Sequence, residues 1–210
     1  MQDQAYFVAP PEGTGPGILV LPSWWGLTAP IRRRADALAD AGFTVLVPDM
    51  ALGERPASEE DAERILGEAD PNRLASLVLS SALLLAEKTT DDEIGVVGLG
   101  MGGSLALWLA VRRPDLVAAS VSFYGSQAID FAGARAAFQI HLAESDRFIS
   151  VDESAFMEAT MGLESLDVSF IRYPGTNHGF ADTESPAYDQ DAGDRAWAST
   201  VDFLTTRLGP

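Results

Sequence analysis

Short, uninterrupted apolar runs alternate along the chain with longer segments in which apolar residues return every three or four positions. A fully apolar run is typical of a strand buried on both faces of a parallel sheet, and the three-to-four spacing is typical of a helix with one buried face. Strands are therefore expected at residues 17–21, 44–47, 94–97, 118–123, 138–142 and 168–172, with a short extra strand at 6–8. This alternation predicts an α/β protein.

The helical segments carry start and stop signals. The first helix is expected to be capped by Thr28 and to end at Gly42, because a hydroxyl can accept from the first-turn amides and glycine terminates helices. A second opens at Asp70, directly before a proline, and a third begins after Gly100. The last spans roughly residues 187–207.

The charged segment at residues 53–68 is expected to be a surface excursion that holds a short helix, with the acidic run 59–63 on a solvated face. No internal repeat or low-complexity linker is visible. With 210 residues, of which 47% are hydrophobic, the chain can bury one continuous core. We therefore expect one domain over residues 1–210.

Repeated strand, helix, strand units with short connections imply right-handed crossovers and a doubly wound sheet. In such sheets, ligands bind beyond the carboxyl ends of the strands. Function is therefore expected in the loops that follow strands, which include residues 22–27, 98–103, 124–126, 143–148 and 173–180.

Composition narrows the classes of partner. The chain has 31 acidic and 14 basic residues, a formal charge of −17, which repels nucleic acid and anionic lipid. It has no cysteine, which excludes disulfides, thiolate metal sites and a cysteine nucleophile. Neither a secretory signal nor an apolar stretch long enough to cross a membrane is visible. We expect a cytoplasmic protein whose partner is a small molecule, and the oligomeric state stays open.

Residues 94–110 read as a strand, a glycine-dense turn and an alanine-rich helix, the context of a nucleophile elbow. The turn also fits the dinucleotide pattern G-x-G-x-x-G. That pattern belongs after the first strand of its unit, whereas this turn follows the third or fourth strand, and Asp115 precedes the next strand instead of ending it. The two histidines are far apart and lack ligand-spaced acids, so neither a nucleotide nor a metal is expected as cofactor.

Two later loops carry an acid and a base. Asp146 follows one predicted strand and His178 follows the next, so the chain order is elbow, acid, histidine, as in α/β-hydrolases. Because the carboxyl ends of parallel strands share one edge of a sheet, these side chains are expected to meet. An imidazole oriented by a carboxylate is a general base suited to neutral pH. His141, inside a strand, is expected to be packed and hydrogen-bonded instead.

The chain resembles the dienelactone hydrolase family of small α/β-hydrolases over nearly its whole length. The matching segments are ILVLPSWWGL, RRRADALADAGFTVLVPDM, GLGMGGSLA, FYG, HLAESDRFIS and YPGTNHGFAD, in this order. The resemblance implies an α/β-hydrolase fold, a doubly wound and mostly parallel sheet flanked by helices. It also implies a hydrolase that acts on a small ester, a lactone or a related carbonyl compound.

This chain departs from the family pattern at the position that matters most. The nucleophile of the family, a cysteine or serine, falls on Gly100, so that position is vacant. The first-loop glutamate of the family falls on Ser23, and an arginine that holds a substrate carboxylate in some members falls on Asp182. An anionic dienelactone is therefore not the expected substrate.

Other parts of the family site need no nucleophile. The resemblance implies that the backbone amides of Met101 and Trp24 form the oxyanion hole, and Met101 also opens a helix, whose positive end favours developing negative charge. Trp24, Trp25, Phe123 and Tyr124 are expected to line the mouth of the pocket and to supply an apolar wall.

Three groups can replace the missing nucleophile. They are Ser23 in the first loop, Ser104 one turn into the helix that follows the elbow, and a water molecule activated by His178. The first hypothesis is accordingly a weak hydrolase with a non-standard mechanism. The alternative is a pseudoenzyme that binds a small molecule in the retained pocket without turning it over.

Overall fold

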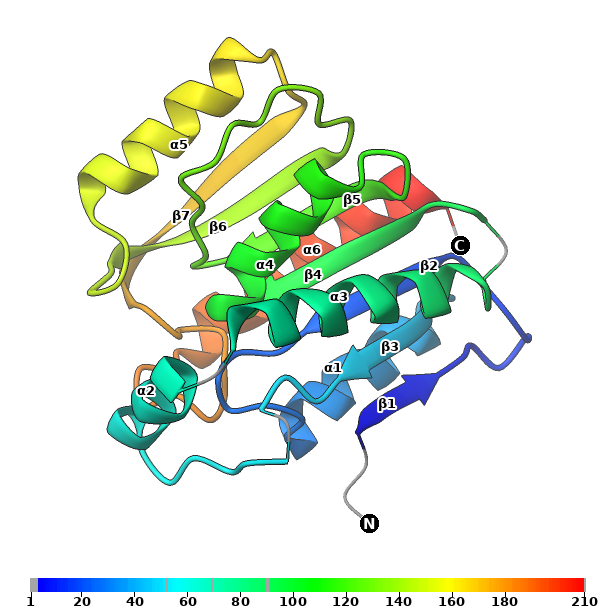
Figure 1. The fold of residues 1–210 in the computed structure, drawn as a ribbon, viewed down its shortest axis with the longest axis horizontal. Helices are drawn as coiled ribbons and strands as arrows, with labels where there is room; N and C mark the ends of the chain where they lie inside the picture. Colours follow the sequence, from blue (N-terminus) through cyan, green and yellow to red (C-terminus); the bar gives the residue numbers. More distant parts are fainter. Residues whose placement is uncertain (1–3, 52, 69, 90, 210) are drawn as a thin grey trace.

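A seven-stranded sheet forms the centre of the computed structural model, which describes residues 4–51, 53–68, 70–89 and 91–209 (Figure 1). Its strand order is β1-β3-β2-β4-β5-β6-β7; β1 pairs antiparallel with β3, and the other neighbours are parallel. The strands are β1 (Ala5–Val8), β2 (Gly17–Leu21), β3 (Thr44–Pro48), β4 (Ile94–Leu99), β5 (Val117–Phe123), β6 (Ala137–Ser145) and β7 (Val168–Asn177). The predicted α/β class and mostly parallel sheet are confirmed.

Helices cover both faces of the sheet, as a doubly wound fold requires (Figure 1). The helices are α1 (Ala29–Asp40), α2 (Glu59–Glu68), α3 (Pro71–Ala86), α4 (Met101–Arg112), α5 (Val151–Leu163) and α6 (Gln190–Leu208). On one face α1 and α6 bury Leu38 and Trp197 against the sheet. On the other face α3, α4 and α5 bury Val78, Leu107 and Met157. Both faces of the central strands are thereby covered, which is why β2 and β4 contain no polar side chain.

Helix ends follow the sequence signals with one difference. Asp70 is the N-cap of α3, and its side chain accepts from the amide of Asn72 at 2.9 Å. Gly42, at φ 99°, lies just past α1 as expected. Thr28 is the N-cap of α1, but its side chain makes no capping hydrogen bond. This helix therefore depends on the proline in its first turn and on its packing.

The helix α5 is absent from the sequence predictions. Its buried residues are Met157 and Met161, whereas its apolar residues Val151 and Leu163 are more than 80% exposed, so no continuous apolar stripe marks it. A local signal was present, because Ser150 and the glutamate three residues later form a reciprocal capping box.

His141 is a core residue, as predicted. Its ring lies 2.8 Å from the Tyr173 hydroxyl, 3.0 Å from the Gln139 side chain and 3.1 Å from the Thr200 hydroxyl. The ring also stacks on Phe123 at 4.4 Å. Burial lowers the pKa of His141 to about 3, so the imidazole is neutral at physiological pH. The expectation that Phe123 lines the pocket is wrong, because its ring is fully buried in this cluster.

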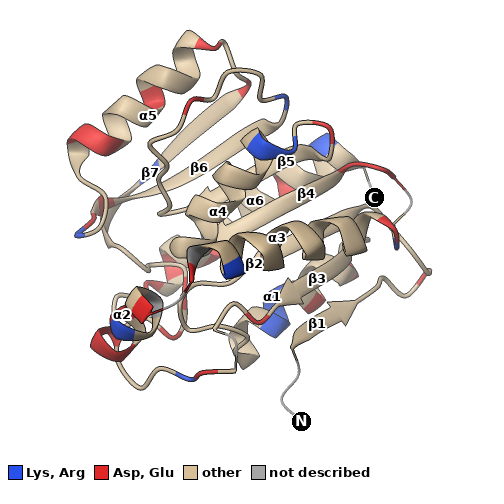
Figure 2. Cartoon of the chain, viewed as in Figure 1, with Lys and Arg blue, Asp and Glu red and all other residues tan. Residues whose placement is uncertain are grey.

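Acidic residues are spread over α2, α5 and several loops, whereas basic residues are fewer and scattered (Figure 2). Within the described ranges, no helix is both long enough and apolar enough to cross a membrane.

Candidate active site

The turn between β4 and α4 has the sharp geometry of a nucleophile elbow. Gly100 at its apex has φ 54° and ψ −117°, a backbone conformation that side chains rarely adopt. Its glycine neighbours allow close packing, since a Cβ on Gly98 would collide with the Gly102 carbonyl and one on Gly102 with the Leu21 carbonyl. Close packing thus explains why this turn is rich in glycine, and nucleotide binding is not needed as an explanation.

The space at Gly100 is open and faces the histidine. A Cβ built on Gly100 would lie 3.5 Å from Nε2 of His178, 3.9 Å from Cε2 of Tyr124 and 4.0 Å from Cβ of Ser23. All three are ordinary van der Waals separations. A nucleophile side chain, or a water molecule in its place, therefore fits within hydrogen-bonding reach of the imidazole.

Asp146 and His178 meet at the carboxyl ends of β6 and β7, as predicted. Nδ1 of His178 lies 2.8 Å from Oδ2 of Asp146, and the histidine amide donates to the Ser145 carbonyl at 3.2 Å. The other Asp146 oxygen accepts from the amides of Phe148 and Ile149 at 2.8 and 3.1 Å. The carboxylate is held in place by backbone donors, and the imidazole is oriented with Nε2 toward Gly100.

Met101 and Trp24, whose backbone amides the family resemblance assigns to an oxyanion hole, both line the cleft at this position, which is described below. Met101 is the first residue of α4, and Trp24 lies in the loop between β2 and α1. In the described part of the chain, neither amide donates to a protein acceptor. A helix N-terminus also carries a partial positive charge. These donors are available to an oxygen that develops negative charge.

A cleft of about 300 Å³ opens over Gly100 and collects most of the predicted site residues. The predicted residues that line it are Ser23, Trp24, Trp25, Gly100, Met101, Ser104, Tyr124, His178 and Asp182. Asp146 lies behind His178. Ser126, Phe148 and Gly179 also line the cleft and lie in loops that were expected to carry the function; the lining residues that sequence reasoning missed are Glu59, Ile149, Glu153 and Ser185.

Aromatic rings form much of the wall. The Phe148 ring lies 4.6 Å from the His178 ring and 5.3 Å from the Trp24 ring, edge to face in both cases. The Tyr124 ring lies 4.9 Å from the His178 ring. The signal for Phe148 was its place two residues after Asp146, in the loop that carries the acid.

Ser23 and Ser104 both reach the cleft, but each already has a hydrogen bond. The Ser23 hydroxyl donates to Oδ2 of Asp182 at 2.5 Å, and the Ser104 hydroxyl accepts from the Ser126 amide at 3.1 Å. Burial raises the pKa of the Asp182 carboxyl, and the Ser23 hydrogen bond opposes that rise. Two of the three positions at which this chain departs from the dienelactone hydrolase pattern are thus in direct contact.

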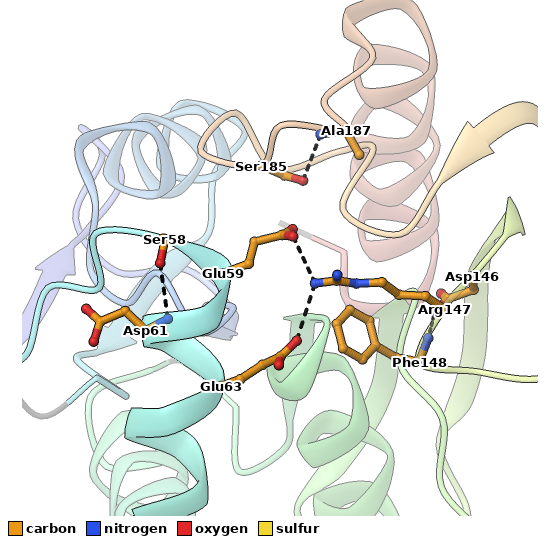
Figure 3. Close-up of polar contacts among 9 residues, drawn as sticks. All are labelled: Ser58, Glu59, Asp61, Glu63, Asp146, Arg147, Phe148, Ser185 and Ala187. Atoms are coloured by element: carbon orange, nitrogen blue, oxygen red, sulfur yellow. Dashed lines mark hydrogen bonds and ion pairs between the residues drawn. The ribbon is translucent and has the colours of Figure 1, made fainter.

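An ion-pair bridge joins α2 to the loop that carries Asp146 (Figure 3). The guanidinium of Arg147 lies 2.8 Å from Glu59 and 3.4 Å from Glu63, and it sits 4.4 Å from the centre of the Phe148 ring. Glu63 is exposed, as expected of a solvated face, whereas Glu59 is partly covered and lines the cleft. Sequence could not show this bridge because 84 and 88 residues separate the partners.

No group of three or more His, Asp or Glu side chains in the described residues is arranged to hold a metal ion. The groups that can take part in a reaction are an oriented imidazole and two amides without a protein acceptor, beside a mostly apolar wall.

Several known proteins resemble this chain in sequence along nearly its whole length. Residues 4–208 match the sequence profile of the dienelactone hydrolase family. Protein usf of Aquifex pyrophilus is 31% identical over 214 residues, which cover 96% of this chain and 93% of that protein. Carboxymethylenebutenolidase 1 of Cupriavidus pinatubonensis is 27% identical over 224 residues, which cover 98% of this chain and 92% of that protein.

The fold also matches solved structures. A dienelactone hydrolase-like promiscuous phosphotriesterase from metagenomic libraries superposes with a TM-score of 0.77 at 22% identity. The match covers 94% of this chain and 88% of that one. At this level of identity the likeness concerns the fold.

Proposed function

Because the chain belongs to the dienelactone hydrolase family, we propose that it hydrolyses small esters or lactones slowly, with a water molecule in place of the missing nucleophile. The observation that carries this proposal is the imidazole of His178. Asp146 orients it at 2.8 Å, and its Nε2 faces the open space at Gly100. A chain that had lost every catalytic demand would have no need of this paired base.

In the proposed reaction, water donates a hydrogen bond to Nε2 of His178 and adds to the substrate carbonyl carbon while its proton passes to the imidazole. The carbonyl oxygen becomes an oxyanion and accepts from the amides of Met101 and Trp24. Asp146 stabilises the imidazolium. When the tetrahedral intermediate collapses, the imidazolium returns the proton to the departing alkoxide, so atoms and charge balance. No acyl-enzyme forms.

The expected rate is low. Removing a nucleophile from a Ser-His-Asp site costs about 10⁶ in kcat and leaves roughly 10³ over the uncatalysed reaction, from binding and the oxyanion hole. Water is preferred to the two serines as nucleophile for a geometric reason. The Ser23 hydroxyl donates to a carboxylate, and the Ser104 hydroxyl accepts from an amide, whereas the space at Gly100 faces the base directly.

The test is the hydrolysis of p-nitrophenyl acetate above the buffer background. We expect His178→Ala to remove the excess, Asp146→Asn to lower it by about 10²-fold or more, and Ser104→Ala to change it little. Thermal unfolding of each variant checks that it is folded. If His178→Ala retains the parent rate, the proposal fails.

A second measurement addresses the mechanism. Acid quenching during turnover, followed by intact mass measurement, is expected to show no acetylated parent protein. Acetylation of Ser23 or Ser104 would refute the water mechanism and identify the nucleophile.

The alternative function is a binding protein without turnover. The observation that favours it is Gly100 itself, because φ 54° strains any other residue by about 1–3 kcal/mol and glycine is what remains when no nucleophile is needed. This alternative takes precedence if the parent and His178→Ala are equally inactive while a small ligand still binds the cleft.

A further inference from the structure

We propose that the cleft selects substrates that carry a positive charge, such as small ammonium-bearing esters, and that Asp182 is the residue that determines this specificity. The inference rests on the proposed function, since it names the substrate class of the same site. It stands on the charges of the lining and on the geometry of the aromatic wall.

The charges that face the cleft are mostly acidic. Asp182, Glu59 and Glu153 line it, and Asp146 lies behind the imidazole, whereas no lysine or arginine lines it in the described residues. The nearby Arg147 does not line the cleft and is paired with Glu59 and Glu63 of α2, so it offsets the charge of Glu59. A substrate carboxylate would therefore find no cationic partner, and it would meet the field of several like charges.

Asp182 is one of the three acids in the cleft wall. Its carboxylate is partly buried and accepts from Ser23, whose Cβ lies 4.0 Å from the open position at Gly100. The carboxylate is therefore linked through Ser23 to the part of the cleft that holds Gly100. Water screens a partly buried charge less than an exposed one, so the carboxylate of Asp182 discriminates strongly between charged and neutral ligands.

The aromatic wall suits an organic cation. The rings of Trp24 and Trp25 are perpendicular, at 85° with centroids 6.1 Å apart, and the Phe148 ring is perpendicular to Trp24 at 84°. Both tryptophans are only partly buried. The faces of aromatic rings attract ammonium groups, most strongly when a carboxylate is also near. Rings and acids together replace the hydration shell of a cation.

A matched pair of probes isolates charge from shape. Choline and 3,3-dimethylbutanol have nearly the same volume, but only choline is charged, and the same holds for acetylcholine and 3,3-dimethylbutyl acetate. Equilibrium binding of the two alcohols is measured by calorimetry or by tryptophan fluorescence. Hydrolysis of the two esters is measured separately, as kcat/KM.

The variant Asp182→Asn removes the charge and keeps an oxygen that can accept from Ser23. The matched control is Asp202→Asn, which removes one charge from an exposed position of α6 outside the cleft. We expect the parent and the control to bind choline about tenfold or more tightly than 3,3-dimethylbutanol, and Asp182→Asn to bring this ratio close to one. Added salt is expected to weaken choline binding and to leave the neutral alcohol unaffected.

Equal binding of the two alcohols by the parent would overturn the inference, and so would a preference for choline that survives Asp182→Asn. The result is separable from the proposed function. His178→Ala tests the proposed function through turnover alone, whereas the choline preference is an equilibrium ratio that His178→Ala is expected to retain.

Discussion

Restoring a serine at the elbow is the sharpest perturbation of this site. In Gly100→Ser, the new Cβ lies 3.5 Å from Nε2 of His178 and at least 3.9 Å from Tyr124 and Ser23, so no neighbour has to move. A Cβ–Oγ bond of about 1.4 Å then places the hydroxyl within hydrogen-bonding reach of the imidazole. The oriented base and the two amides are already in place.

Two magnitudes follow from the geometry. Serine at φ 54° costs about 1–3 kcal/mol of folding stability, and each kcal/mol lowers the Tm of a chain of this size by about 2–4 °C. Loss of a nucleophile costs about 10⁶ in kcat, so its return is expected to raise ester turnover by at least about 10³. The variant is expected to be less stable and more active.

The assay compares Gly100→Ser with the parent on p-nitrophenyl acetate, with a pre-steady-state burst and acetylation of residue 100 as evidence for an acyl-enzyme. The matched control is Gly133→Ser. Gly133 also has a positive φ of 81° and has no atom within 4 Å of its built Cβ, so the substitution imposes backbone strain without touching the cleft. The double variant Gly100→Ser/His178→Ala is expected to lose the gain. A stable, folded Gly100→Ser without a burst or rate increase would refute the geometry derived for the site.

The remaining predictions concern stability and the bridge to α2. Burial lowers the pKa of His141 to about 3, from about 6.5 in the unfolded chain. The neutral, buried imidazole therefore contributes fully to the free energy of unfolding above pH 6.5, and this contribution is lost as the pH falls toward 3. At pH 5 the expected loss is about 2 kcal/mol. Urea unfolding at pH 7.5 and 5 is expected to show a weaker pH dependence in His141→Gln, and an unchanged dependence would contradict this. Arg147→Ala is expected to change the Tm little, since exposed ion pairs contribute about 0–1 kcal/mol, but to speed proteolysis within α2, which Arg147 holds to the loop of Asp146. The control is Arg172→Ala, which breaks another exposed ion pair. Equal rates of cleavage in the two variants would contradict a tethering role for Arg147. Asp70→Ala is expected to cost about 1 kcal/mol through the lost cap of α3, measured by thermal unfolding.

The parts that sequence predicted share a physical cause. Central strands such as β2 and β4 are buried on both faces and therefore consist of apolar residues alone, which is visible without a structure. The chain order of elbow, Asp146 and His178 was sufficient to predict that the acid and the histidine meet, because parallel strands bring successive loops to one edge of the sheet. Helix α5 escaped prediction because it buries one narrow face, and apolar residues lie on its exposed side as well.

The contacts between distant loops were beyond sequence reasoning. Nothing local relates Ser23 to Asp182, which are 159 residues apart, and the 2.5 Å hydrogen bond between them exists only because the first and last of these loops meet over α4. The placement of Phe123 failed for a similar reason. One end of β5 is near the site, but the side chain at its last position points into the core while Tyr124 points to the cleft.

By itself, the sequence determined the fold class and the positions of Gly100, Asp146 and His178 directly after strands, because these are encoded in local patterns and in chain order. Only the tertiary structure decided that the imidazole faces the open space at Gly100, that Asp182 and Glu59 line the cleft, and that Arg147 pairs with Glu59 and Glu63. These are relations between side chains on different loops. Their distances depend on how the layers pack, which no local pattern records.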